Sequence, residues 1–239
     1  MQRANYTMSK IIIIGNQKGG VGKSTIATLC ANALSQDPFN LKVCIIDTDR
    51  QKSIVEARDF DVEDYKGEPP YKILGMDLPS LQKEIYALDK EYDLIFIDTA
   101  GRLDINLDIQ QQEITKALMY ADFLFIPFRA GNFNLDATLE YLKMVIKLSK
   151  LRGESERQLR FMGFVNMFRD RSKTNTDLIL EIENLKSAGI KFMSTRLRNY
   201  TLFEDINTID SLYDVNSTDK AKLNFTVWLN EFIKTLKDE

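Results

Sequence analysis

The residues of this chain best suited to chemistry form a short glycine-rich segment that carries two lysines. The segment reads Lys18-Gly19-Gly20-Val21-Gly22-Lys23-Ser24-Thr25. Glycines let a backbone fold closely around an anion, and a helix that begins at such a turn offers free N–H groups and a partial positive charge. A lysine in the position of Lys23 can reach the outer phosphates of a nucleotide, and a hydroxyl in the position of Ser24 can bind Mg²⁺. The segment therefore predicts a loop that binds a nucleoside triphosphate, with contacts from Lys18 through Thr25.

The residues on either side of this loop fit that interpretation. Four isoleucines, Ile11–Ile14, precede the loop as an expected strand, and the pattern of Lys23–Ser35 follows it as an expected helix. The order of strand, glycine loop and helix is the context that a phosphate loop requires. The loop is a variant, because Gln17 stands where the usual pattern has its first glycine.

A second strand end supplies a candidate metal ligand. The run Leu94–Ile97 is wholly apolar and carries Asp98 at its carboxyl end. Behind a phosphate loop, an aspartate in this position holds the ligand shell of Mg²⁺. We therefore expect Ser24 and Asp98 to share one magnesium site.

Composition limits the remaining possibilities. The 239 residues are 44% hydrophobic and 28% charged, which is typical of an ordinary globular chain with enough material for a core. The net charge is −3, so any nucleic-acid contact must use a local patch. Histidine is absent, which excludes imidazole bases and histidine-bound metals. Cys30 and Cys44 fit small buried residues of a reducing cytoplasm, and no apolar stretch approaches membrane-spanning length.

The alternation of short apolar runs with longer helical patterns predicts an α/β fold. Continuous apolar runs suit strands buried on both faces, and the alternation gives right-handed βαβ crossovers. We expect one P-loop NTPase domain over residues 10–239, with a mostly parallel twisted sheet flanked by helices on both faces. Residues 1–9 are expected to be an N-terminal extension, and Asp59–Pro70 a surface excursion. The expected strands are Lys10–Gly15, Lys42–Asp47, Tyr71–Gly75, Asp93–Asp98, Asp122–Pro127, Arg160–Asn166 and Ile190–Met193. The expected helices are Lys23–Ser35, Leu78–Leu88, Leu107–Tyr120, Leu135–Lys150 and Thr176–Ala188.

The loop with two lysines resembles the deviant Walker A motif of the ParA/MinD family of P-loop ATPases. The resemblance implies that Lys18 crosses a dimer interface to the nucleotide of the partner, so that ATP and Mg²⁺ close a sandwich dimer. The segment Asp47-Thr48-Asp49-Arg50-Gln51 resembles the family's Asp-x-Asp-Pro-Gln, which implies that Asp47 lies near the metal and Asp49 orients the attacking water. Arg50 departs from that pattern, because the family usually has proline there. The resemblance also implies that Asn166 lies near the adenine.

A group of basic residues in the second half of the chain is a candidate DNA interface. Ser194–Phe203 resembles a ParA segment in which a short basic strand end leads into a helix. Loops at one rim of a parallel sheet could bring five cations together for a sequence-independent contact with phosphates. These residues are Arg169, Arg171, Lys173, Arg196 and Arg198. Solvated loop charges, some of them paired with acids, are the alternative interpretation.

Three other functions remain open at this stage. Asp98-Thr99-Ala100-Gly101-Arg102 also resembles a signal-recognition-particle-type GTPase, although the guanine-selecting Lys-x-Asp is missing after Asn166. A MinD-like positioning ATPase needs a C-terminal membrane helix, and Phe225–Leu236 has apolar residues at helical spacing. Its acidic end and few lysines favour a helix docked on the sheet, without stable membrane association. A nucleotide-gated adaptor is the third alternative.

Taken together, these patterns predict a ParA-type partition ATPase. The expected protein forms an ATP-dependent homodimer, binds DNA non-specifically and is stimulated by a ParB-like partner. We expect it in the cytoplasm, associated with the nucleoid. The sequence leaves the cargo open between a plasmid, a chromosome, a mobile element and a protein assembly.

Overall fold

The strands of this protein form one parallel sheet. The computed structural model describes residues 8–99, 107–153, 157–170, 173–214 and 218–237. In this part of the chain the sheet has six strands in the order β3-β2-β4-β1-β5-β6, and every neighbouring pair is parallel. The strands are β1 Lys10–Ile14, β2 Val43–Asp47, β3 Lys72–Gly75, β4 Leu94–Asp98, β5 Phe123–Phe128 and β6 Arg160–Val165.

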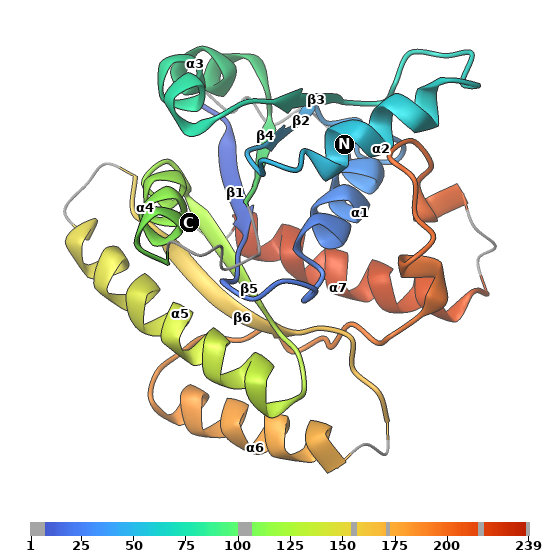
Figure 1. The fold of residues 1–239 in the computed structure, drawn as a ribbon. Coiled ribbons are helices and arrows are strands. Elements are labelled where there is room, and N and C mark those ends of the chain that lie inside the picture. Colours follow the sequence, from blue (N-terminus) through green and yellow to red (C-terminus); the bar gives the residue numbers. More distant parts are fainter. Residues whose placement is uncertain (1–7, 100–106, 154–156, 171–172, 215–217, 238–239) are drawn as a thin grey trace.

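Helices cover both faces of the sheet (Figure 1). Among the described residues they are α1 Lys23–Ser35, α2 Ser53–Val62, α3 Leu78–Glu91, α4 Leu107–Leu118, α5 Asn132–Leu151, α6 Lys173–Ser187 and α7 Lys220–Lys237. Two short 3₁₀ turns, Thr201–Phe203 and Leu212–Asp214, lie before α7. None of the helices described is long and apolar enough to cross a membrane. The architecture is that of the P-loop NTPase fold expected from the sequence.

Alternation along the strands divides the core into two layers. Ile12 and Ile14 face a cluster built with α1, α2 and α7, whereas Ile11 and Ile13 face a cluster built with α3, α4, α5 and α6. Successive side chains of a strand point to opposite faces, so a strand that is apolar throughout needs helices on both sides. The isoleucine run before the loop therefore fixes β1 in the centre of the sheet.

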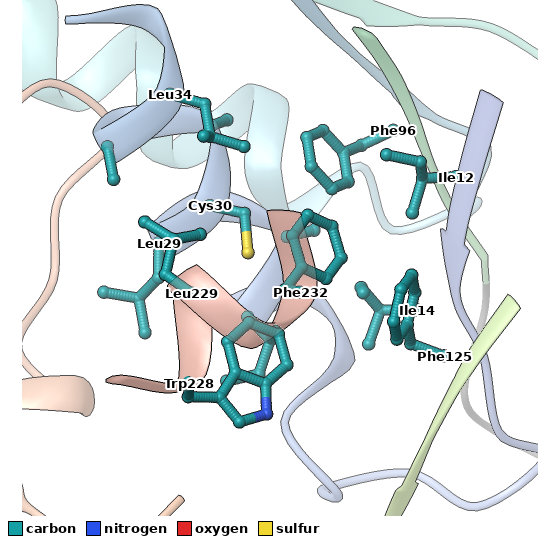
Figure 2. Packing of buried hydrophobic residues seen from close by; sticks show 14 of the residues in the cluster. Ile12, Ile14, Leu29, Cys30, Leu34, Phe96, Phe125, Trp228, Leu229 and Phe232 are labelled. Carbon is teal, nitrogen blue, oxygen red and sulfur yellow. The ribbon is translucent and has the colours of Figure 1, made fainter. Parts of the chain in front are cut away.

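Helix α7 is docked on the sheet, as its apolar spacing predicts. Phe225, Trp228 and Phe232 are fully buried, and the ring of Phe232 packs 4.5 Å from that of Phe125 between centroids. Figure 2 shows Trp228, Leu229 and Phe232 between α1 and the central strands. The apolar side of this helix is thus used inside the molecule.

The expected seventh strand, Ile190–Met193, is wrong. Only Phe192 pairs with the sheet, as an isolated bridge to Gly163. After Met193 the pairing with β6 is interrupted, because the N–H groups of Ser194 and Thr195 donate to the Glu231 carboxylate of α7, at 2.5 and 2.8 Å. The chain bonds to β6 again only at Leu197, whose N–H donates to the Val165 carbonyl at 2.9 Å. A side chain has taken the donors that would have extended the strand.

The expected surface excursion at Asp59–Pro70 is wrong at its start, because α2 continues to Val62. Within this helix only Ile54 and Arg58 are buried, which leaves little apolar periodicity to detect. The first turn is satisfied from outside the helix, since Asp47 Oδ2 accepts hydrogen bonds from the N–H groups of Ile54 and Val55 at 3.1 and 3.4 Å. A cap from a preceding strand end is not visible in local sequence.

Candidate nucleotide-binding site

The glycine loop lies at the centre of the carboxyl edge of the sheet. It joins β1 to α1, and β1 lies between β4 and β5. Gly20 and Gly22 have φ angles of +71° and +89°, which residues with a side chain rarely adopt. A Cβ at Gly22 would also lie 2.5 Å from Asn166 Nδ2. Both glycines are therefore required by the shape of the loop.

Three side chains hold the loop from outside. Asn16 is buried, accepts a hydrogen bond from the Lys18 N–H at 2.9 Å, and donates from Nδ2 to the carbonyl of Pro127 in β5 at 3.0 Å. Asn166 Nδ2 donates to the Val21 carbonyl at 2.9 Å, and Arg129 Nη1 donates to the Gly20 carbonyl at 2.7 Å. The structure thus places Asn166 against the loop, and its contact with adenine stays a prediction. Sequence reasoning missed Asn16 and Arg129, although both follow a strand at the carboxyl edge.

Lys23 lies inside the loop as a buried cation. Its exposed fraction is 6%, and its Nζ lies 3.3 Å from the Lys18 carbonyl oxygen. Burial lowers the pKa of Lys23, while the nearby carboxylates of Asp98 and Asp49 act in the opposite direction. A desolvated ammonium group at this place can bind phosphate oxygens strongly.

Ser24 and Asp98 meet as the sequence predicts. The Ser24 hydroxyl donates to Asp98 Oδ2 at 2.8 Å. The other oxygen, Oδ1, is buried and has no hydrogen-bond partner among the described residues. Burial is the main reason why the pKa of Asp98 is raised to about 7. An unpaired carboxylate oxygen beside a hydroxyl is a donor set that suits Mg²⁺.

The remaining acid of the predicted metal set is adjacent but already bonded. Asp47 pairs with Asp98 in the register of β2 and β4 and is fully buried. Its carboxylate accepts hydrogen bonds from α2 and from the Asp49 N–H at 3.0 Å. Burial raises the pKa of Asp47. In the described part of the chain no group of three acidic or thiol ligands converges.

Asp49 lies on the loop that follows β2. The neighbouring Thr48 donates from both its N–H and its hydroxyl to the Asp98 carbonyl, at 3.0 and 2.7 Å, and so ties the ends of β2 and β4 together. A cavity of about 640 Å³ opens beside Asp49, between this loop and the start of α3. Arg50, at the unusual position, forms an exposed ion pair of 3.2 Å with Glu113 of α4.

The side chain of Lys18, unlike that of Lys23, has no polar partner among the described residues. Its side chain is partly exposed and forms no hydrogen bond or ion pair within the residues that the structure describes. Two lysines five residues apart therefore have different surroundings, one closed into the loop and one open to a further molecule.

The basic residues predicted to bind DNA lie partly together. Residues Phe168 and Arg198 form a parallel bridge, which brings the two loops side by side. The guanidinium of Arg198 pairs with Asp170, and that of Arg196 lies 5.0 Å from the centroid of the Phe168 ring. Arg169, Lys173, Arg196 and Arg198 are all exposed, and Arg171 lies outside the described residues. These contacts bring Arg196 and Arg198 beside the loop that carries Arg169, and Arg198 is already paired to an acid; the DNA interface stays a prediction.

The fold and the loop define a P-loop nucleotide-binding protein, and comparison with known families makes this more specific. The family described as CobQ/CobB/MinD/ParA nucleotide binding domain matches residues 12–207. This chain belongs to that family.

Individual relatives are distant in sequence. The maintenance of carboxysome distribution protein A of Halothiobacillus neapolitanus is 22% identical over 194 residues, which cover 81% of this chain and 82% of the relative. A putative plasmid partition protein of Borrelia burgdorferi bound to AMPPNP has a TM-score of 0.66 at 21% identity, over 95% of this chain and 99% of that one. An ATP complex of a McdA variant from Cyanothece has a TM-score of 0.70 at 17% identity, over 95% and 97%. Both structures share the fold.

A third similar structure carries the metal. Cobyrinic acid a,c-diamide synthase of Mycobacterium smegmatis with bound ADP and magnesium has a TM-score of 0.65 at 13% identity, over 97% of this chain and 96% of that one. The ligands of these neighbours support the cofactors expected from the sequence, ATP and Mg²⁺.

Proposed function

We propose that this chain is a partition ATPase of the ParA type, which binds ATP with Mg²⁺, dimerises on ATP and hydrolyses it slowly. The observation that carries the proposal is the contrast between its two loop lysines. Lys23 is buried beside Asp98, whereas the side chain of Lys18 has no partner in the described chain. A lysine left open at the mouth of the loop is suited to reach the phosphates of a second subunit.

Hydrolysis would be an in-line transfer of the terminal phosphoryl group to water. Asp49 orients the attacking water, because a carboxylate is the available base in a chain without histidine. Lys23 and the partner's copy of Lys18 bind the phosphate oxygens, whose charge they offset. Ser24 and Asp98 hold the metal, with Asp47 behind them; when bound, Mg²⁺ neutralises part of the phosphate charge.

Release and cargo attachment would depend on the rim of exposed cations. Arg169, Lys173, Arg196 and Arg198, with Arg171 beside them in sequence, would contact DNA phosphates without reading bases. A ParB-like partner would stimulate hydrolysis and reopen the dimer. The protein would then act in the cytoplasm, on the nucleoid.

A cargo other than DNA is the second candidate. Two of the similar proteins are a carboxysome-distribution protein and McdA, whereas others are plasmid partition proteins. A positioning ATPase would use the same nucleotide site and dimer and carry a protein assembly. The family match gives no support to the signal-recognition-type GTPase.

The dimer can be tested by light scattering after size exclusion. Nucleotide-free protein, ATP–Mg²⁺ and GTP–Mg²⁺ would be compared for the wild type and Lys18→Ala. We expect a dimer with ATP alone, and its loss in Lys18→Ala without loss of ATP binding. Lys143→Ala is the matched control, because Lys143 is an exposed lysine of α5 paired with Glu140 at 2.7 Å. A dimer that persists in Lys18→Ala, or one that GTP also forms, contradicts the proposal.

The DNA interface needs a separate test. Arg196→Glu with Arg198→Glu should abolish ATP-dependent retention on non-specific DNA while leaving ATP-dependent dimerisation intact. The control is Lys143→Glu with Lys147→Glu on α5, which makes the same change in charge elsewhere. Retention should also fall steeply with salt, because counterions are released from the phosphates. Unchanged retention in the arginine double variant would remove this rim from the proposal and favour the positioning alternative.

A further inference from the structure

Two carbonyls of the phosphate loop accept hydrogen bonds from side chains that follow distant strands. Arg129 follows β5 and donates from Nη1 to the Gly20 carbonyl at 2.7 Å. Asn166 follows β6 and donates from Nδ2 to the Val21 carbonyl at 2.9 Å. These two carbonyls belong to consecutive peptide groups, so the two side chains act on neighbouring parts of the same turn.

Each of these hydrogen bonds also fixes the direction of an N–H group. A trans peptide group is planar, and its C=O and N–H point in opposite directions. Because Arg129 holds the Gly20 carbonyl, the N–H of Val21, in the same peptide group, points away from Arg129. Because Asn166 holds the Val21 carbonyl, the N–H of Gly22 points away from Asn166 in the same way.

Both N–H groups are left open to a ligand. Among the described residues, neither the Val21 nor the Gly22 N–H donates a hydrogen bond, although the Val21 side chain is 1% exposed. Buried backbone donors normally have partners. Two neighbouring N–H groups without partners, such as those of Val21 and Gly22, can bind an anion. Glycine on either side would otherwise let these peptide groups rotate, because Gly20 and Gly22 have little steric restraint.

We propose that Arg129 is a positioning residue for nucleotide binding, which orients the Val21 N–H toward the phosphates by holding the Gly20 carbonyl, with Asn166 doing the same for Gly22. Arg129 makes no ion pair with any carboxylate that the structure describes. The polar contact of its side chain is the hydrogen bond to the Gly20 carbonyl. Because it acts from outside the turn, it needs no contact with the nucleotide. The inference rests on the proposed function only in taking a nucleoside di- or triphosphate as the ligand.

The decisive measurement is made without nucleotide. Backbone amide ¹H–¹⁵N shifts and hydrogen exchange at Val21 and Gly22 would be compared in the wild type, Arg129→Met, Arg129→Lys and Asn166→Ala. We expect Arg129→Met to alter Val21 more than Gly22, and Asn166→Ala to alter Gly22 more than Val21. Arg129→Lys keeps a charged donor and should stay closer to the wild type. Unchanged Val21 signals in Arg129→Met would overturn the proposal.

Binding of Mg²⁺–ADP, measured by calorimetry, completes the test. We expect Arg129→Met to weaken binding roughly 5- to 20-fold, and Arg129→Lys to recover most of that loss, since a charge-assisted hydrogen bond is restored. The control is Arg160→Met at the opposite end of the sheet, where the guanidinium stacks 4.1 Å from the centroid of the Phe123 ring. Weaker binding without a change at Val21 means that Arg129 acts by charge alone, which also overturns the proposal. If the wild type binds no nucleotide, the proposed function fails, while the amide signals still decide whether Arg129 orients the loop.

Discussion

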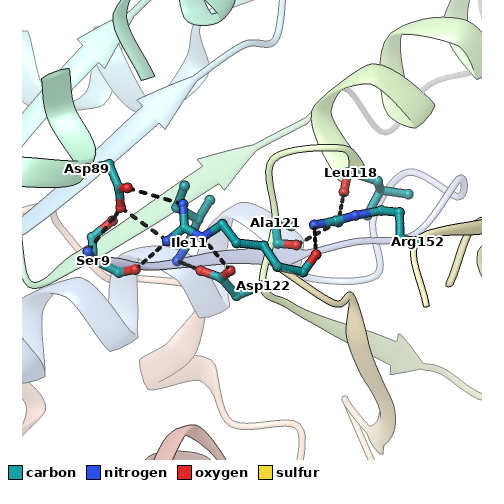
Figure 3. Close-up of polar contacts among 8 residues, drawn as sticks. Ser9, Ile11, Asp89, Leu118, Ala121, Asp122 and Arg152 are labelled. Carbon is teal, nitrogen blue, oxygen red and sulfur yellow. Dashed lines mark hydrogen bonds and ion pairs between the residues drawn. The ribbon is translucent and has the colours of Figure 1, made fainter. Parts of the chain in front are cut away.

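Buried charged side chains lie at both edges of this sheet, and the two edges differ in how many hydrogen-bond partners these side chains have. At the amino edge, the guanidinium of Arg157 lies 3.2 Å from Asp89 and 3.0 Å from Asp122. Ser9 and Ile11 donate further hydrogen bonds to these carboxylates, and Arg152 donates to the carbonyls of the α4–β5 connection, as Figure 3 shows. Burial still raises the pKa of Asp122, but Asp89 and Asp122 each accept from at least two donors.

At the carboxyl edge two buried charges, Asp98 and Lys23, have incomplete sets of partners among the described residues, although Asp47 beside them accepts several backbone hydrogen bonds. Asp98 Oδ1 has no partner in the described chain, and Lys23 has only a carbonyl oxygen at 3.3 Å. The pKa of Asp98 is raised to about 7, mainly because burial is not compensated. Unsatisfied buried charge costs stability, so it persists where a ligand completes it. Asp98 and Lys23 thus differ from Asp89 and Asp122 of the amino edge in how fully their hydrogen bonds are made.

The largest change in stability is expected when the cluster of Arg157, Asp89 and Asp122 at the amino edge is broken. Arg157→Met leaves Asp89 and Asp122 buried without their cation, and it should lower the free energy of unfolding by about 3 kcal/mol. Urea denaturation of the nucleotide-free protein measures this loss. Adding Asp89→Asn and Asp122→Asn should restore a good part of it, because the unpaired charges disappear. A loss of unfolding free energy below about 1 kcal/mol would mean that these ion pairs stabilise the fold no more than exposed pairs do.

The second effect has its origin at the carboxyl edge and depends on pH. A carboxyl group whose pKa is raised on folding binds its proton more tightly in the folded state, so stability falls as pH rises through that pKa. With a pKa of about 7 for Asp98, metal-free protein should lose about 1.4 kcal/mol between pH 6 and pH 8 on this account. Asp98→Asn should remove that part of the slope. An identical slope in both proteins would show that Asp98 is not the group that titrates.

A smaller effect distinguishes stability from binding at the same edge. Ser24→Ala removes the hydroxyl that donates to Asp98 at 2.8 Å. We expect a change of about 1 kcal/mol in unfolding free energy, the usual value of one hydrogen bond. Magnesium-dependent nucleotide binding, followed by calorimetry with and without the metal, should weaken by about tenfold or more. If Ser24→Ala weakens nucleotide binding equally with and without Mg²⁺, Ser24 is not a ligand of the metal.

The smallest change in stability is expected for an exposed ion pair away from both edges, which serves as the reference for the other changes. Lys186 and Glu183 form an exposed pair of 3.0 Å on α6. Glu183→Gln should change the unfolding free energy by less than about 0.5 kcal/mol, since exposed pairs are screened by solvent. A change as large as that of Arg157→Met would invalidate the contrast between buried and exposed charges drawn here.

Local patterns were enough for much of the fold and of the site. The loop from Lys18 to Ser24, and the acid at the end of β4, could be read because their chemistry requires adjacent residues or one uninterrupted strand. Helix α2 was missed because its cap comes from Asp47 and its buried face has an arginine instead of an apolar residue. The strand expected at Ile190–Met193 was wrong because only the bridge at Phe192 forms. It is not extended, since Glu231, nearly 40 residues away, accepts from the next two N–H groups, those of Ser194 and Thr195.

The class of this protein can be predicted from local patterns: an isoleucine strand, a glycine loop with two lysines, and carboxylates at strand ends. These are short-range features, and glycine is the residue type that permits the positive φ angles of the loop. Only the tertiary structure decided which side chains hold that loop in shape. Arg129 and Asn166 reach it because β5 and β6 end at the same edge as β1, and hydrogen bonds between residues more than 100 positions apart are set by strand order. The same order decided which buried charges are matched and which are left open for a ligand.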